Sequence, residues 1–351
     1  MDQSSFSARL IEWYEKNKRD LPWRNTNDIY RIWLSEIILQ QTRVLQGLPY
    51  YQRFIERFPD LENLAHATED EVLREWQGLG YYSRARNLHN CAKILQQKHH
   101  GQWPKSYKEL KKLPGIGEYT AAAIASFAYK EPVPVVDGNV YRVMSRIYGI
   151  KQDISSQKAR KTFADYSLQL IPKEAPDSYN QAIMEFGATV CLPQPKCRDC
   201  LFRQECYAFQ NNLQRELPVN LKKVRISKRY FYYIVYAFQK KLYMKQRQHK
   251  DVWRQLYDFY MIENEEGLNY QQVINKNNLD HDQASLVLAS PSYKHVLTHQ
   301  KIFARFFLVN LTRPLPIAFA EKHQLALFDE DQIENLPKPK LISNFLRDLN
   351  Y

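Results

Sequence analysis

The chain has 351 residues, of which 44% are hydrophobic and 13% aromatic, so it carries enough apolar material for packed cores and is not a disordered chain. At roughly 150 residues per domain, this length predicts two or three domains. The 10 glycines and 17 prolines exclude a collagen-like or low-complexity protein. No stretch has the roughly 18 uncharged apolar residues of a membrane span, and the N-terminal segment lacks the apolar centre of a signal peptide. We therefore expect a cytoplasmic protein.

The charge is positive and unevenly distributed. The net charge is +12, and the segment from Lys222 to Lys250 holds ten basic residues and no acidic one. A positive field attracts polyanions, and nucleic acid is the obvious candidate, although a merely solvated basic surface would have the same composition.

Residues 1–215 are predicted to be mainly α-helical, because apolar residues recur there with helical spacing and alternating strand patterns are absent. Asn27 or Asp28 is expected to cap one helix, and Thr68 with Glu71 forms the capping-box pattern of another. Helices are expected over 6–17, 29–42, 72–79, 85–97, 120–129, 139–149, 158–171 and 179–191.

The chain changes character at residues 216–228, where the apolar periodicity stops and the charge rises, which predicts a linker. Beyond it, two β-rich runs on either side of Gln239 and Lys240 predict a hairpin. Further strands are expected over 258–263 and 301–311, and helices near 270–277 and over 341–350. This pattern predicts a C-terminal α+β domain over residues 229–351.

Two turns could carry chemistry. In the segment LPGIG, Leu113, Gly115 and Gly117 precede a helix, and such a glycine-bearing turn exposes backbone N–H groups to a phosphate. Asp137 opens the next helix twenty residues after Gly117. An ordinary helix–helix turn, and simple helix capping by Asp137 or Asn139, are the structural alternatives.

Four of the five cysteines lie within sixteen residues, with the spacing C-x5-C-x2-C-x5-C. In a chain without a secretory signal, such a group of thiols predicts a metal or cluster site rather than a disulfide framework. The spacing alone suits either zinc or a 4Fe-4S cluster. The predicted ligands are Cys191, Cys197, Cys200 and Cys206.

Together, LPGIG, Asp137 and the four-cysteine loop resemble the helix-hairpin-helix DNA glycosylases of the endonuclease III superfamily. Within that superfamily, the first 210 residues look like the adenine DNA glycosylases. The motifs that carry this resemblance are LPWR (21–24), WLSEIILQQT (33–42), GLGYYSRARNLH (78–89) and VDGNVYRV (136–143). The resemblance implies excision of adenine mispaired with 8-oxoguanine or guanine in double-stranded DNA, a 4Fe-4S cluster in the loop 191–206, and a glycosylase domain over residues 1–215. The first gap between cysteines is five residues, whereas the family usually has six.

The resemblance implies roles for two carboxyl groups. Cleavage of the glycosidic bond needs a proton on the leaving base and a negative charge beside the cationic sugar. Glu36, among apolar residues of a predicted helix, would be the general acid, although without the resemblance it is more simply a solvated surface residue. Asp137 would stay ionised and stabilise the oxocarbenium ion. Tyr119 occupies the position of the Schiff-base lysine in the lyase branch, which predicts a monofunctional enzyme.

The DNA contacts follow from the same resemblance. Gln41 and Tyr81 are expected to wedge into the duplex, with Thr42 near the base opposite the adenine. Arg24 would contact the extruded adenine, and Asn139 would orient Asp137. Packing between helices is the structural alternative for Tyr81.

The C-terminal domain resembles the Nudix-like module that this family appends, without a visible magnesium-binding catalytic box. The segment HVLTH matches the loop that reads 8-oxoguanine, where relatives carry Phe-Ser-His. Here Leu297 and Thr298 replace the first two residues, and His299 matches the third. A buried hairpin with internally satisfied histidines is the alternative.

We expect a bacterial, nucleoid-associated monomer with no membrane contact. A glycosylase for an oxidised pyrimidine or a mismatched thymine is the alternative enzyme. A non-catalytic DNA-binding protein that holds a metal is the alternative of a different class. Such a protein would need neither Glu36 nor Asp137.

Overall fold

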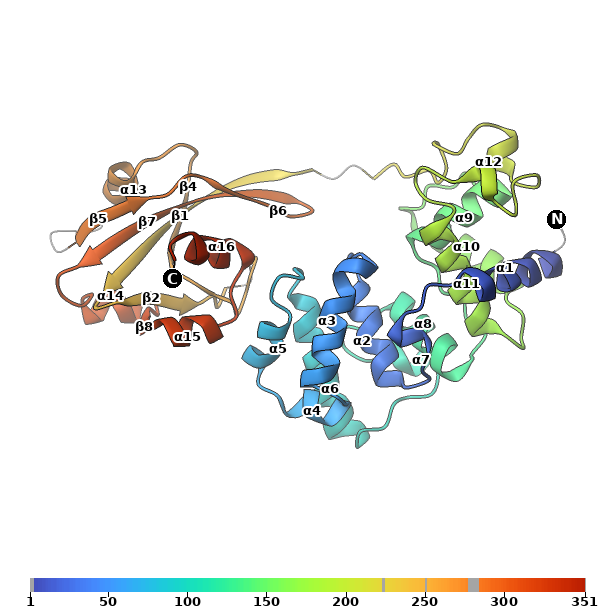
Figure 1. Cartoon of the computed structure of the whole chain (residues 1–351), viewed down its shortest axis with the longest axis horizontal. Coiled ribbons are helices and arrows are strands. Elements are labelled where there is room, and N and C mark those ends of the chain that lie inside the picture. The colour runs from blue at the N-terminus through green and yellow to red at the C-terminus, as the bar shows by residue number, and fades with distance from the viewer. Residues whose placement is uncertain (1–2, 223–224, 250, 277–283, 351) are drawn as a thin grey trace. The chain divides into compact units, whose positions relative to one another are not determined.

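The computed structural model describes residues 3–222, 225–249, 251–276 and 284–350 (Figure 1). The chain forms two compact units: residues 1–66 with 87–222, and residues 67–86 with 223–351. The domain and linker boundaries expected from the sequence stay predictions. None of the helices in the described part of the chain is long and apolar enough to cross a membrane.

The first unit is built from helices, as the sequence predicts, and its described residues contain no strand. Helix α6 begins in residues that belong to the second unit. The helices are α1 (Gln3–Asn17), η1 (Pro22–Arg24), α2 (Ile29–Leu39), α3 (Val44–Arg57), α4 (Leu61–His66), α6 (Ser83–His99), α7 (Tyr107–Leu110), α8 (Glu118–Tyr129), α9 (Gly138–Tyr148), α10 (Gln157–Leu170), α11 (Pro176–Thr189), η2 (Cys197–Asp199) and α12 (Tyr207–Gln210).

Helix α2 shows how local sequence sets the limits of these elements. Asp28 caps it, because the aspartate side chain accepts a hydrogen bond from the Tyr30 backbone N–H at 2.9 Å. The helix ends at Leu39, three residues earlier than expected, and Gln41 adopts a left-handed φ of 55°. The chain therefore turns sharply just after the helix.

One buried cluster of the first unit joins α1, α9, α10 and α11. It contains six aromatic side chains, and Phe6 and Phe186 both pack against Phe202 of the cysteine-bearing segment. This packing holds α9 and α11, which both contribute to the site described below, against the same core.

The second unit contains one short helix from the N-terminal half and an α+β fold from the C-terminal half. Thr68 and Glu71 form the predicted capping box of that helix, α5 (Glu69–Glu75). The other elements are β1 (Ser227–Phe238), β2 (Lys241–Gln246), β3 (Tyr257–Asp258), β4 (Tyr260–Asn264), α13 (Tyr270–Lys276), β5 (Ala284–Ala289), β6 (Tyr293–Val296), β7 (Gln300–Leu311), α14 (Ile317–Lys322), β8 (Ala326–Phe328), α15 (Glu330–Asn335) and α16 (Lys340–Asp348).

Strand β1 is the centre of the sheet. It pairs in parallel with β7 and antiparallel with β2 and β4, and β5 and β6 both pair with β7. Gln239 and Lys240, both at positive φ, form the predicted hairpin turn between β1 and β2.

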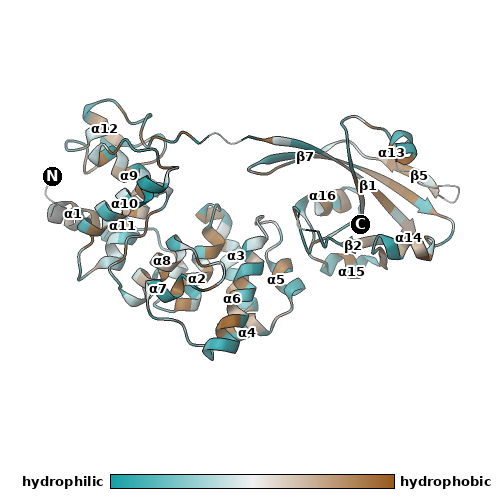
Figure 2. Ribbon diagram, turned by 180° about the vertical axis from the view of Figure 1, so that it is seen from behind, coloured by the Kyte–Doolittle hydropathy of each residue, from teal (hydrophilic) through white to brown (hydrophobic). Residues whose placement is uncertain are grey.

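Both faces of β1 are covered, so the strand is a near-continuous apolar and aromatic run. On one face, Tyr232 stacks on Phe307; on the other, Tyr233 stacks on Phe306, which in turn stacks on Phe345 of α16. Figure 2, in which brown marks hydrophobic residues, shows brown segments in the ribbons of both units.

Candidate active site

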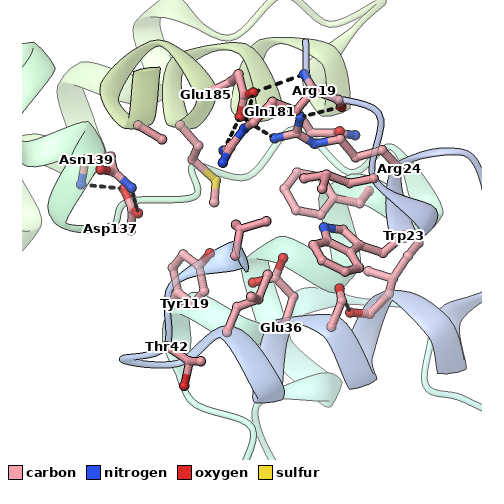
Figure 3. A pocket seen from close by; sticks show the side chains of 18 residues that line it. Arg19, Trp23, Arg24, Glu36, Thr42, Tyr119, Asp137, Asn139, Gln181 and Glu185 are labelled. Carbon is pink, nitrogen blue, oxygen red and sulfur yellow. Dashed lines mark hydrogen bonds and ion pairs between the residues drawn. The ribbon is translucent and has the colours of Figure 1, made fainter. Parts of the chain in front are cut away.

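A cavity of about 190 Å³ in the first unit lies between α2 and α8 on one side and η1, α9 and α11 on the other (Figure 3). Its lining residues come from separate parts of the sequence, so only the folded chain can assemble it. Six residues singled out from the sequence line it: Arg24, Glu36, Thr42, Tyr119, Asp137 and Asn139.

Glu36 is the buried acid of this cavity. Helix α2 is apolar on nearly every side and lies inside the unit. Glu36 is therefore buried with it and is only 7% exposed. The alternative of a solvated surface residue is therefore wrong.

The surroundings of Glu36 raise the pKa of its carboxyl group to about 7. Burial is the largest cause, and the nearby negative charge of Asp137 acts in the same direction. A hydrogen bond from the Tyr119 hydroxyl and the positive charge of Arg24 oppose the rise. A carboxyl group with this pKa is partly protonated at neutral pH and can donate a proton.

Asp137 lies at the N-terminus of α9 and caps it. Its carboxylate accepts hydrogen bonds from the backbone N–H groups of Asn139 and Val140, both at 2.8 Å, and from the Asn139 side chain at 2.7 Å. Burial raises the pKa of Asp137, whereas these hydrogen bonds and nearby Arg142 lower it, and the net direction is upward. The residue is both the helix cap and a wall of the cavity.

The side chain of Asn139 is held in one orientation. Its Oδ1 atom accepts a hydrogen bond from Arg142 Nη2 at 2.8 Å, which leaves Nδ2 to donate to Asp137. Gly187 of α11 makes room for it, because a Cβ atom there would lie 2.6 Å from Cβ of Asn139.

Tyr119, in the first turn of α8, faces the two carboxyl groups. Burial and the charges of Glu36 and Asp137 keep the pKa of its phenol well above the usual value, so the hydroxyl stays protonated and donates to Glu36. Among the described residues that line the cavity, none is a lysine.

The opposite wall holds an ion-pair group that was not predicted from the sequence (Figure 3). Glu185 of α11, whose side chain is fully buried, accepts from Arg19 Nε and Nη2 at 2.7 Å and from Arg24 Nη2 at 2.6 Å. Burial alone would raise the pKa of Glu185, but the two guanidinium groups outweigh it and lower the pKa to about 2. A lone carboxylate in the apolar helix segment AIMEFGA was the available signal, as it was for Glu36.

The LPGIG turn joins α7 to α8. Leu113 is buried, and Gly115 has a φ of +77°, where a Cβ atom would lie 2.6 Å from Cβ of Asn87. Gly117 is the N-cap residue of α8, and no atom lies within 4 Å of where its Cβ would be. The turn thus leaves the N-terminus of α8 open, which is the geometry that an anion needs.

The four predicted cysteine ligands are all free thiols in one loop, with Cys191 buried and the other three half-buried. Burial raises the pKa of Cys200 to about 11, and the charges of the other three thiols act in the same direction, so the four lie near one another. Arg146 Nη1 lies 3.5 Å from Sγ of Cys191. Among the described residues, no three potential ligands converge closely enough to hold a metal ion as they stand.

Both predicted wedge residues have left-handed backbone angles. Gln41 and Tyr81 have φ angles of 55° and 49°, and both side chains are exposed. Non-glycine residues in this region are uncommon and cluster at functional sites. Tyr81 is 40% exposed, so packing between helices does not describe it.

Thr298 and His299 lie in the turn 297–300 between β6 and β7, and both are exposed. Within the second unit, the Tyr81 hydroxyl and Thr298 Oγ1 form a hydrogen bond. The structure therefore brings together two residues that the sequence assigned to the same base pair. The alternative of a buried hairpin does not fit this exposure.

Family models match both units. Residues 34–167 match the HhH-GPD superfamily of base excision DNA repair proteins, and residues 231–348 match the NUDIX domain. A solved structure of a thermostable thymine-DNA glycosylase superposes with a TM-score of 0.55 and is 27% identical, covering 60% of this chain and 97% of that one.

Similarity to individual proteins extends over the whole chain. An adenine DNA glycosylase of Buchnera aphidicola subsp. Acyrthosiphon pisum is 31% identical over 358 aligned residues, which cover 99% of this chain and all of that protein. The adenine DNA glycosylase of Mus musculus is 42% identical over 219 residues, which cover 60% of this chain and 42% of that protein. The first match spans both units.

Proposed function

Because the chain belongs to the adenine DNA glycosylase family of base excision repair enzymes, we propose that it removes adenine mispaired with 8-oxoguanine or guanine in double-stranded DNA. The reaction hydrolyses the N-glycosidic bond and leaves an abasic site. The observation that carries the proposal is that Glu36 and Asp137 share one cavity in different electrostatic surroundings.

Glu36 is the general acid of the proposed mechanism. Its raised pKa leaves the carboxyl group protonated in a large fraction of molecules near pH 7, and it passes that proton to N7 of the extruded adenine. The glycosidic electron pair then leaves with the base. Tyr119, which donates to Glu36, holds the carboxyl group in place.

Asp137 stabilises the positive charge that develops on the sugar. Its carboxylate is fixed by the three hydrogen bonds from Asn139 and Val140, so it needs no reorganisation as the charge appears. Water then adds to C1′ and loses a proton, so that one water is consumed for each adenine released. Asn139 orients Asp137 in this step.

Tyr119 makes the enzyme monofunctional. A phenol cannot form an imine with the sugar, and no lysine is among the described residues of the cavity wall. Borohydride should therefore trap no covalent protein–DNA adduct.

The remaining site residues, other than Glu36 and Asp137, are assigned to DNA recognition. The N–H groups of the Leu113–Gly117 turn contact a phosphate, and Arg24 contacts the adenine. Gln41 and Tyr81 fill the space that the flipped adenosine leaves, and Thr42 lies near the base opposite the adenine. Thr298 and His299 contact the 8-oxoguanine edge, and the threonine hydroxyl can donate or accept there.

The four cysteines are the proposed ligands of a 4Fe-4S cluster, with zinc as the alternative. The four thiols belong to one loop and interact electrostatically, and Cys191 lies beside Arg146; four soft sulfur ligands in one loop support the assignment. The cluster would fasten the loop to α9. Anaerobically purified protein should contain about four irons per chain. One zinc per chain in a colourless protein would contradict the cluster.

The test uses five duplexes, which carry adenine opposite 8-oxoguanine, guanine, cytosine or thymine, and thymine opposite guanine. After incubation under single-turnover conditions, alkali cleaves the strand wherever a base is missing. We expect cleavage of the adenine strand opposite 8-oxoguanine and guanine. Thymine release from the guanine duplex with intact adenine, or no base release at all, would reject the proposal. We expect the active species to be a monomer in the bacterial cytoplasm.

A further inference from the structure

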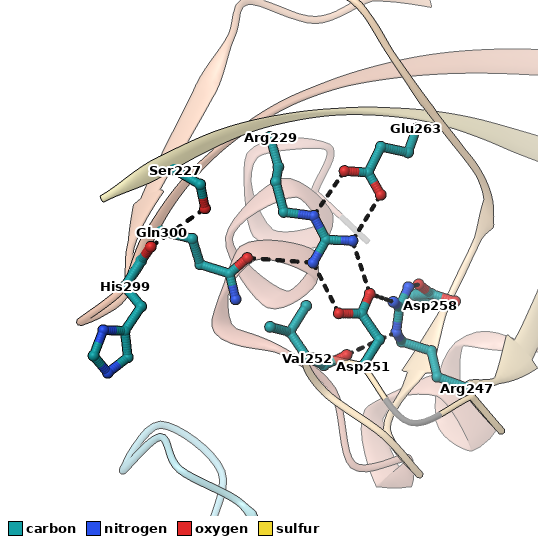
Figure 4. Close-up of polar contacts among 9 residues, drawn as sticks. All are labelled: Ser227, Arg229, Arg247, Asp251, Val252, Asp258, Glu263, His299 and Gln300. Atoms are coloured by element: carbon teal, nitrogen blue, oxygen red, sulfur yellow. Dashed lines mark hydrogen bonds and ion pairs between the residues drawn. The ribbon is translucent and has the colours of Figure 1, made fainter. Parts of the chain in front are cut away.

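A dense cluster of charged side chains lies next to the turn 297–300 in the second unit (Figure 4). We call it the Arg229 cluster. Its two arginines and Asp258 are mostly buried, with side chains that are 20% (Arg229), 9% (Arg247) and 0% (Asp258) exposed, whereas Asp251 and Glu263 reach the surface at 31% and 43%. The cluster consists of Arg229, Arg247, Asp251, Asp258 and Glu263.

Arg229, on β1, uses all five of its N–H bonds. Nε and Nη2 donate to Glu263 at 2.7 and 2.6 Å, and Nη1 and Nη2 donate to Asp251 at 2.8 and 2.9 Å. The remaining Nη1 hydrogen goes to Oε1 of Gln300 at 3.2 Å. Two bidentate carboxylates fix the guanidinium plane, so the bond to Gln300 starts from a rigid donor.

Arg247 extends the cluster into the loop between β2 and β3. It donates to Asp258 at 2.6 Å, to Asp251 at 3.1 Å and to the carbonyl of Val252 at 3.0 Å. The next residue, Trp253, packs edge-on against His295 of β6 at 5.3 Å. The cluster therefore supports the β6–β7 hairpin from a second side.

Gln300 connects the Arg229 cluster to the turn. Its backbone carbonyl accepts a hydrogen bond from the Leu297 N–H at 2.8 Å, and this bond closes the turn. The carbonyl of His299 accepts from the N–H and Oγ of Ser227 on β1, at 3.0 and 3.3 Å. The turn backbone is thus held by β1, whereas the Gln300 side chain is held by Arg229.

We propose that Arg229, acting through Gln300, is a positioning residue that fixes the turn 297–300. Thr298 and His299 are then already ordered when they contact the base opposite the adenine. This inference rests on the proposed function of the turn. Ordering an exposed turn during binding costs conformational free energy, and a turn that is ordered beforehand avoids that cost. The effect should therefore depend on whether the opposite base is 8-oxoguanine or guanine.

Gln300→Leu is the most direct variant, because it removes the acceptor and leaves the Arg229 ion pairs in place. Gln300→Glu restores an acceptor for Arg229 and should rescue the defect. Gln271→Leu, at an exposed position of α13, is the matched control. Thermal denaturation of each variant reports whether the fold is retained.

The first readout is amide hydrogen exchange of residues 295–301 in the free full-length protein, which should be faster in Gln300→Leu and normal in Gln300→Glu and in the control. The second readout is the single-turnover rate on A·8-oxoguanine relative to A·G at subsaturating enzyme. Gln300→Leu should lower this ratio about tenfold, as expected when one hydrogen bond to a charged group is removed. Unchanged exchange, or faster exchange with an unchanged ratio, overturns the proposal.

A parallel pair of variants separates this inference from the proposed function. Thr298→Ala and His299→Ala should each lower the same ratio if the turn reads the opposite base. If they do and Gln300→Leu does not, the positioning role of Arg229 is wrong and the function of the turn stands. If neither lowers the ratio, both are wrong.

Discussion

Glu36 and Asp137 have the same functional group but different partners for it. Glu36 is buried on an apolar helix and has one hydrogen-bond donor, Tyr119, among the contacts that shift its pKa. Asp137 has three donors at the positive end of α9. Burial raises the pKa of both groups, but at Asp137 three hydrogen bonds to the carboxylate counteract the rise, whereas Glu36 has one such donor. This difference is how two carboxyl groups can divide an acid role and an electrostatic role.

The rate of base release should depend on pH through Glu36. The acid acts when protonated and the pKa of its carboxyl group is about 7, so the single-turnover rate should be high below pH 7 and fall above it, tending to tenfold for each further unit. Rates at saturating enzyme between pH 5.5 and 9 measure this. Glu36→Gln should abolish release while duplex affinity at pH 6 stays within about twofold, because the shape is kept and the carboxyl group is largely neutral at that pH. A flat profile, or normal turnover of Glu36→Gln, would exclude the acid role.

Glu185→Gln should shift that profile to lower pH. Without the carboxylate, the positive charges of Arg19 and Arg24 are unbalanced, and Arg24 already lowers the pKa of Glu36. A decrease of about one pKa unit would cost about tenfold in rate at pH 8 and little at pH 5.5. Glu205→Gln, which removes the partner of Arg9 at the surface, is the control. An equal decrease in rate at every pH would mean that Glu185 acts only on stability or binding.

Among the elements, the turn between α7 and α8 shows two glycines needed for different reasons. Gly115 is required by its backbone angle and by the contact with Asn87, whereas Gly117 has open space where a side chain would be. Gly115 is therefore needed for folding. Gly117 is needed so that a DNA phosphate can approach the N-terminus of α8.

Alanine substitutions at the two glycines should therefore affect different properties of the protein, namely stability and DNA binding. Gly115→Ala should lower the free energy of unfolding by about 1–3 kcal/mol, because it strains the backbone and displaces Asn87. Gly117→Ala should leave stability nearly unchanged and weaken duplex binding, because its Cβ obstructs the phosphate. Urea denaturation and fluorescence anisotropy measure the two effects. If both variants bind DNA normally, the turn does not contact the backbone of the duplex.

At the scale of the whole molecule, the tertiary structure reduces the number of positive charges that the segment from Lys222 to Lys250 exposes. Arg229 and Arg247 are paired with internal carboxylates, and Lys245 has its pKa lowered by burial. Positive charge that remains exposed includes Lys222, Arg225 and Lys228. Composition alone overstates the charge that this segment can offer to a polyanion.

We expect those three exposed side chains to account for the DNA binding of the segment. Changing all three to glutamine should reduce the slope of log affinity against log salt by about 0.9 for each phosphate that the segment then no longer neutralises. A variant with glutamine at Lys240 and Lys241, which are exposed farther along the same segment, and at Lys322 tests whether the effect is confined to residues 222–228. Equal slopes for the first variant and the unchanged protein would show that these side chains are merely solvated.

Periodicity and short-range hydrogen bonds were enough to predict the helical first half, the α+β second half and the capped helix starts, because these features depend on residues close together in the chain. A family resemblance in the same residues also named Glu36, Asp137 and Tyr119. Strands β5, β6 and β8 were not predicted, because they are only three to six residues long. In addition, β5 and β8 pair with β7 and β2, which are not their neighbours in the chain.

Only the tertiary structure determines which side chains share a cavity and which charges are paired. Glu185 lies more than 160 residues from Arg19 and Arg24, and Arg229 lies 71 residues from Gln300. No local pattern encodes such pairs. The pKa of Glu36 depends on the same long-range packing, because burial and neighbouring charges set it and both exist only once separate helices have come together.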